Sequence, residues 1–106
     1  MSVAQTVNVQ ITVQAPETME VYASVEPLPY LKGRPLHIVV CAYLRPVAAY
    51  EDLKPCPNAL VRVKKDGVVI ARGVTDETGV FVCDYTPEET GTITLTVEVA
   101  SYEQAG

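Results

Sequence analysis

The chain of 106 residues contains no Trp, one Phe, one His and three Cys. No apolar run approaches the roughly 20 residues that a membrane-spanning helix needs, and the N-terminus lacks the charged-then-apolar layout of a signal peptide. The length suits one domain and excludes two-domain enzymes and large cofactor folds. A single His leaves little from which to build a catalytic triad, and no glycine-rich phosphate loop is present. We therefore expect a protein that is neither inserted in a membrane nor an enzyme.

Val and Thr, in contrast, make up about a quarter of the residues, a bias that favours half-buried strands over helices. Most of the apolar stretches alternate with polar residues at a period of two, which is typical of a strand with one buried face. The sequence predicts an all-β, antiparallel β-sandwich of about seven strands. The expected strands are 7–13, 20–25, 36–44, 59–65, 68–71, 81–85 and 93–99.

One hairpin is predicted in detail. Asp66-Gly67 is a two-residue turn signal, because a type I′ turn needs a positive φ at both central residues. Pairing Lys65 with Val68 then places Ile70 opposite Val63 on the buried face.

Two other connections are distinctive. In residues 75–79 the Asp76 side chain can accept hydrogen bonds from nearby backbone, and Gly79 can adopt a left-handed conformation. Residues 45–58 form the longest connection, and loops of this length are often functional.

Charge is unevenly distributed along the chain. The net charge of −5 opposes nucleic-acid binding, because attraction to phosphates is missing overall. Residues 1–72 carry all eight Lys and Arg against six acids, a net of +2, whereas residues 73–106 carry seven acids, a net of −7. Either this polarity helps copies or neighbouring domains to associate end to end, or the acids simply collect in exposed loops.

The three cysteines leave at least one thiol unpaired. Cys41 and Cys83 lie in apolar strands, where they are either small hydrophobic residues or a disulfide bridge between the sheets. Cys56, between two prolines, is expected in an exposed loop.

The sequence gives little support for a metal-binding site. His37 and Cys41 share a strand face but are about 13 Å apart, too far for one zinc ion with ligands at about 2.0–2.3 Å. The paired carboxylates are typical of solvated turns, so no cofactor is expected. Calcium is the remaining alternative, because it could bridge carboxylates of the loops, although the chain has no Asp-x-Asp-x-Asp loop. The pairs are Glu51-Asp52, Asp76-Glu77 and Glu88-Glu89.

From residue 33 to about residue 100 the chain resembles Ig-like sandwich modules. The matching segments have structural roles in turns and core: Gly33–Val39, Asn58–Val63, Gly73–Phe81, Tyr85–Pro87 and Gly91–Val97. They are similar to invasin/intimin-type bacterial Ig-like domains and to carboxypeptidase-regulatory-like (transthyretin-like) domains. The resemblance implies an extracellular, cell-surface or virion setting and carries little information on function.

We therefore divide the chain into residues 1–18, an Ig-like sandwich over 19–100, and a tail over 101–106. The first segment is an added edge strand, the last strand of a preceding module, or a strand donated to a neighbour. We predict a non-catalytic structural or interaction module, a unit of a surface, fibre or virion-type assembly. It would bind copies of itself, adjacent domains or another protein through strand edges and loops. The candidate contacts in this segment are Val7, Val9, Ile11 and Val13.

The alternative is an accessory domain that binds a carbohydrate or small ligand through residues 45–58. Tyr50 could stack on a sugar while Glu51 and Asp52 accept hydrogen bonds. The absence of Trp opposes this interpretation.

Overall fold

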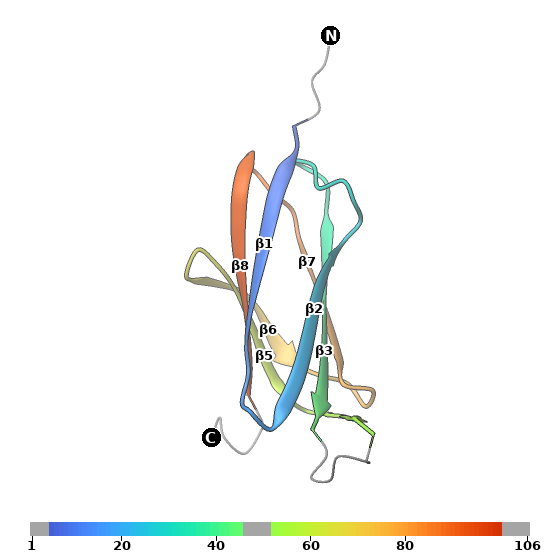
Figure 1. Cartoon of the computed structure of the whole chain (residues 1–106). Helices are drawn as coiled ribbons and strands as arrows, with labels where there is room; N and C mark the ends of the chain where they lie inside the picture. Colours follow the sequence, from blue (N-terminus) through green and yellow to red (C-terminus); the bar gives the residue numbers. More distant parts are fainter. Residues whose placement is uncertain (1–4, 46–51, 101–106) are drawn as a thin grey trace.

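Eight β-strands account for the regular structure of the residues that the computed structural model describes, 5–45 and 52–100, and no helix occurs among them. The strands form two sheets that face each other (Figure 1), which confirms an all-β chain. There is one strand more than expected because a two-residue strand lies inside the 45–58 connection. The strands are β1 (Val7–Gln14), β2 (Met19–Glu26), β3 (Leu36–Leu44), β4 (Lys54–Pro55), β5 (Leu60–Lys65), β6 (Val68–Val74), β7 (Val80–Tyr85) and β8 (Gly91–Ala100).

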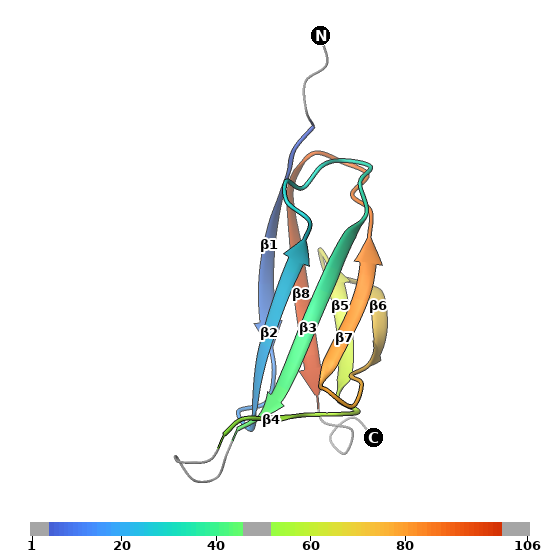
Figure 2. The ribbon, with the colours of Figure 1, turned by 90° about the vertical axis from the view of Figure 1, so that its right-hand side faces the viewer.

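One sheet has the order β1-β8-β5-β6, and the other has β3 between β2 and β7, with β4 crossing the end of β3 (Figure 2). Five of the six strand pairs in the described residues are antiparallel, but β1 runs parallel to β8. The prediction of purely antiparallel sheets is therefore wrong for this pair. The short connection after β1 leads into the opposite sheet, so β1 has no hairpin partner and lies beside a strand of its own direction.

The core lies between the sheets and is built from alternate residues of each strand. Because successive side chains point to opposite faces of a strand, the period-two pattern places one row of β3 against one row of β8. At about 25 cal/mol per Å² of buried apolar surface, these rows supply most of the driving force for folding. The most deeply buried core residues on the strands are Leu36, Ile38, Val40, Ala42, Val61, Val63, Leu95 and Val97.

The two predicted turns have the expected backbone conformations. Asp66 and Gly67 both have positive φ, 50° and 86°, which confirms the type I′ hairpin between β5 and β6. In the turn before β7, Asp76 Oδ1 accepts hydrogen bonds from the Thr78 hydroxyl (2.7 Å) and from the backbone N–H groups of Thr78 (2.8 Å) and Val80 (3.0 Å). These bonds, led by the one from the Thr78 hydroxyl, hold the pKa of Asp76 below its usual range. Gly79 has a φ of 80°, as expected.

The predicted register of the hairpin holds for only two residue pairs. Lys65 pairs with Val68, but a β-bulge follows, and Val63 lies opposite Ala71 rather than Ile70. Ile70 is the extra residue and is 36% exposed, so the prediction that it faces the core is wrong. A bulge places two residues of one strand opposite one residue of its partner, which shifts the alternation by one position.

Cys41 and Cys83 are free thiols on neighbouring strands of the same sheet. Cys83 lies opposite Ile38 and faces the core, whereas Cys41 lies opposite Val80 and faces outward. A bridge between sheets is therefore wrong, because the two thiols lie on opposite faces of one sheet.

Cys56 is 7% exposed, so its predicted place in an exposed loop is also wrong. β4 pairs with Tyr43 and Leu44 and carries the chain across the end of β3. The backbone N–H of Cys56 then donates to the carbonyl oxygen of Ala42 at 2.9 Å. Burial raises the pKa of the Cys56 thiol, and the residue is a member of the buried hydrophobic core.

Candidate functional site

The first candidate site is the row of apolar side chains on β1. All four members point toward the core, but their burial decreases along the strand: Val7 is 6% exposed, Val9 and Ile11 are half-buried, and Val13 is 36% exposed. Two of the core-facing residues of β2, the edge strand of the facing sheet, are also incompletely buried, since Val21 and Ala23 are only half-buried. The core is therefore incompletely covered along this side of the molecule.

β1 is an integral edge strand of its own sheet. It pairs with β8 over all eight residues, from Val7 opposite Gly91 to Gln14 opposite Glu98. Residues 7–14 thus lie at the edge of the chain's own sheet in the described structure, and the assignment of residues 1–18 as a separate segment stays a prediction. The outer edge of β1 has no neighbouring strand in the described structure.

The direction in which each backbone group of β1 points follows from a hydrogen bond at Val7, where the strand begins. The N–H of Val7 donates to the carbonyl oxygen of Tyr30 at 2.8 Å, away from β8. Backbone polar groups alternate sides along a strand, so the even-numbered residues bond to β8 and the odd-numbered ones face outward. Val9, Ile11 and Val13 therefore direct their N–H and C=O groups to the free edge.

This edge also lacks the usual protection against strand pairing. Proteins protect exposed edges with charged side chains, proline or bulges. In the described structure, β2 carries two glutamates, β7 carries Asp84, and β6 carries Arg72 and the bulge. β1 has no charged residue, no proline and no bulge, and the first charged residue of the chain is Glu17.

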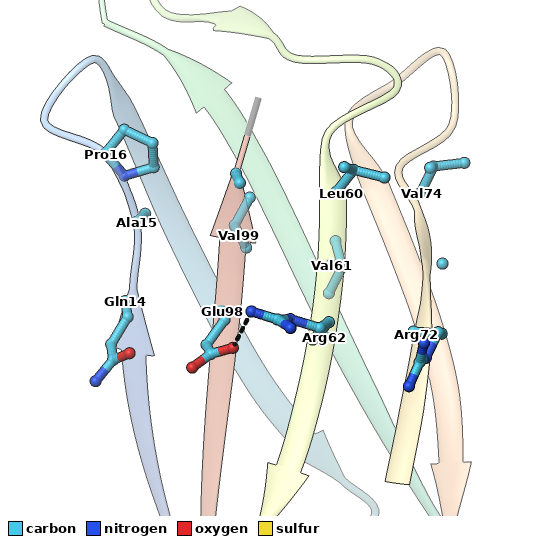
Figure 3. A pocket seen from close by; sticks show the side chains of 12 residues that line it. Gln14, Ala15, Pro16, Leu60, Val61, Arg62, Arg72, Val74, Glu98 and Val99 are labelled. Atoms are coloured by element: carbon cyan, nitrogen blue, oxygen red, sulfur yellow. Dashed lines mark ion pairs between the residues drawn. The ribbon is translucent and has the colours of Figure 1, made fainter. Parts of the chain in front are cut away.

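A second surface feature is an open hollow of about 790 Å³ on the outer face of the same sheet (Figure 3). A polar row crosses its floor, with Gln14, Glu98, Arg62 and Arg72 directly opposite one another on four successive strands. Arg62 Nη2 lies 3.0 Å from Glu98 Oε1, and Lys64 Nζ lies 3.0 Å from Glu98 Oε2. The sequence shows the basic residues of the β5–β6 hairpin, but their pairing with Glu98 follows only from the register of β8.

These ion pairs give stability a pH dependence that can be measured. The hydrogen bond from Lys64, assisted by the charges of Lys64 and Arg62, lowers the pKa of Glu98. The carboxylate therefore stabilises the fold above its unfolded-state pKa of about 4.3, and this contribution is lost as pH falls through the lower folded-state value. We expect Glu98→Gln to be less stable than the native chain at pH 7 and to approach it in acid. Chemical unfolding of both proteins across this range measures the difference, and an unchanged difference would contradict the assignment.

The predicted loop site lies largely outside the described residues. Tyr50 and Glu51 lie outside the described residues, and Asp52, which is described, is exposed. The ligand-binding alternative for residues 45–58 therefore stays a prediction.

No metal centre forms among residues 5–45 and 52–100, where no group of three His, Cys, Asp or Glu side chains is close enough to hold an ion. His37 lies on the outer face of β3, with Nδ1 2.6 Å from Oδ1 of Asp84. The absence of cofactors, calcium included, stays a prediction. In the same described ranges no helix is long and apolar enough to span a membrane.

Comparison of the chain with models of protein families, with curated proteins and with solved structures finds no match.

Proposed function

We propose that this protein is a non-catalytic structural module that associates with copies of itself through the free edge of β1. The observation that carries the proposal is the combination, on one eight-residue strand, of outward-facing backbone groups, half-exposed Val and Ile side chains, and no charge. Addition of a strand to such an edge gains main-chain hydrogen bonds and buries apolar side chains together.

The finer assignment as an Ig-like sandwich belongs to the same proposal. It is supported by two facing sheets with mostly antiparallel pairing and by the resemblance from residue 33 onward. Pairing of two such modules through the β1 edge would make a dimer, which can serve as the unit of a surface, fibre or virion-type assembly.

Val13→Pro tests the proposal. The N–H of Val13 faces away from β8, so proline removes no bond within the chain, while its ring blocks an incoming strand. We expect the native chain to dimerise as its concentration rises from micromolar to millimolar, and Val13→Pro to remain a monomer. Light scattering during size-exclusion chromatography measures both masses.

Val13→Ala is the matched control, because it shortens the same side chain but keeps the N–H group. We expect it to associate, more weakly than the native chain. Circular dichroism checks that each variant remains folded. A native chain that is monomeric over the whole concentration range, or Val13→Pro associating as well as Val13→Ala, would overturn the proposal. Deletion of residues 1–16 is a poorer test because it would uncover β8 and the core.

A further inference from the structure

We infer that two copies join by antiparallel pairing of β1 with the β1 of the second copy, about a two-fold axis through Ile11, to form one continuous eight-stranded sheet. This inference rests on the proposed function and specifies the geometry of the interface. It follows from three features of the edge: its symmetry, the backbone groups that are free, and the side chains that would meet.

Symmetry fixes the direction of pairing. Two identical edges can face each other about a two-fold axis either perpendicular to the sheet or parallel to the strands. An axis parallel to the strands would turn one copy over and place its apolar row beside the polar row of the other. An axis perpendicular to the sheet makes the two β1 strands antiparallel and keeps both apolar rows on the same face. The two facing pairs of sheets then continue side by side.

The free backbone groups fix the register. In an antiparallel pair, residues whose N–H and C=O groups face the partner lie opposite one another, so only odd-numbered residues can form these pairs. At the start of β1 the edge is already occupied by bonds within the chain. The N–H of Val7 donates to the carbonyl oxygen of Tyr30, and the carbonyl oxygen of Gln5 accepts from the N–H of Lys32 at 2.9 Å. The free residues are thus Val9, Ile11 and Val13.

Only one register uses all three free residues of both copies. It places Ile11 opposite Ile11 of the second copy and Val9 opposite Val13, and both groups of each of these residues are then bonded. A shift of the partner by two residues in one direction brings the occupied Val7 into the interface. A shift in the other direction places Val9 opposite Ala15 of the second copy, which lies beyond the end of β1. Both shifted registers therefore form fewer hydrogen bonds between the copies.

The side chains suit this register on both faces. On the core face, the half-exposed Val9, Ile11 and Val13 would cover one another, which is the kind of cross-strand apolar contact that stabilises a sheet. On the outer face, Gln10 would lie opposite Thr12 of the second copy. Both are uncharged, so this face gives no repulsion between the copies.

Disulfide trapping distinguishes the registers. Gln10→Cys and Thr12→Cys are made separately in a chain in which Cys41 and Cys83 are replaced by alanine, with buried Cys56 left in place. In the inferred register, the thiol introduced at position 10 of one copy lies opposite the thiol introduced at position 12 of the other, a spacing suited to a disulfide. Two copies of the same variant place their introduced thiols diagonally across the interface instead, at about 7–8 Å.

We therefore expect the mixture of the two variants, on mild oxidation, to form about tenfold more disulfide-linked dimer than either variant alone. Val68→Cys in the same background measures random collision, since Val68 is 66% exposed on β6, far across the sheet from β1. Cross-linking by Gln10→Cys alone or Thr12→Cys alone would show a shifted register and overturn the inference. Cross-linking no greater than for Val68→Cys, in a chain that light scattering shows to be dimeric, would also overturn it while leaving the proposed function in place. A strictly monomeric native chain would overturn both.

Discussion

Gly79→Ala is expected to lower the free energy of unfolding by about 3–5 kcal/mol, an exceptionally large effect for one methyl group. Gly79 has a φ of 80°, where an alanine costs about 1–2 kcal/mol. The larger part of the expected loss is steric, since the added Cβ would overlap the carbonyl oxygen of Ala42 and lie 3.1 Å from the backbone nitrogen of Cys56. These atoms belong to the hydrogen-bonded backbone of β3 and of the segment after β4, and they cannot move without breaking bonds.

The local hydrogen bonds explain why this site cannot relax. The N–H of Ala42 donates to the carbonyl oxygen of Gly79 at 2.8 Å, and the carbonyl oxygen of Ala42 accepts from Cys56 at 2.9 Å. Displacement of Ala42 to accommodate a Cβ would therefore disturb β3, the turn before β7 and the segment after β4 together. The glycine is needed for close approach as well as for its φ.

Gly33→Ala is the matched control. Gly33 has almost the same φ, 81°, but a Cβ there meets no atom within 4 Å. We expect this variant to lose only about 1–2 kcal/mol. Denaturant unfolding of the three proteins measures the difference, and we expect the Tm of Gly79→Ala to fall by about 10 °C or more. Equal losses in the two variants would contradict the argument from packing.

Local patterns predict the parts of this fold that depend on neighbouring residues. The alternation in β1 and β8 and the turn at Asp66-Gly67 all follow from rules that operate over a few residues. The bulge at Ile70 does not, because nothing in the sequence of β6 marks which residue is left unpaired. The parallel pairing of β1 with β8 is also beyond local rules, since it brings together strands from opposite ends of the chain.

The candidate site shows the same division. The row of Val9, Ile11 and Val13 is evident from the sequence, and its position on an edge strand was one of three alternatives. Which side of β1 is free could not be predicted, because the answer depends on where β8 lies and on the bond between Val7 and Tyr30. The charge pairing of Glu98 with Arg62 was hidden for the same reason.

The burial of Cys56 was missed because its cause is a residue far away in sequence. Thr75 is 1% exposed, and its hydroxyl donates to the carbonyl oxygen of Cys56 at 2.6 Å and accepts from the N–H of Ala59 at 2.9 Å. The backbone N–H of Thr75 also donates to the carbonyl oxygen of Ala59, at 2.9 Å. One buried hydroxyl thus satisfies two backbone groups in the segment between β4 and β5 and holds that segment over the core.

Thr75→Val is therefore expected to lower the free energy of unfolding by about 2–6 kcal/mol. Valine has nearly the same shape, so packing is kept, but the N–H of Ala59 and the carbonyl of Cys56 lose their partner in a buried site, and each such loss costs about 1–3 kcal/mol. Equilibrium unfolding in denaturant measures the change. We also expect faster hydrogen exchange at the Ala59 amide, because its donor group is released.

Thr75→Ser separates the hydroxyl from the methyl group. Serine keeps both hydrogen bonds and loses one buried methyl, which is worth about 0.8 kcal/mol, so it should be clearly more stable than Thr75→Val and should keep the Ala59 amide protected. If valine were as stable as serine, the two backbone groups would be finding other partners, and the hydroxyl would not be what holds Cys56 in place. The opposite order makes this threonine, which no local pattern marks, the residue that holds the segment between β4 and β5 in place.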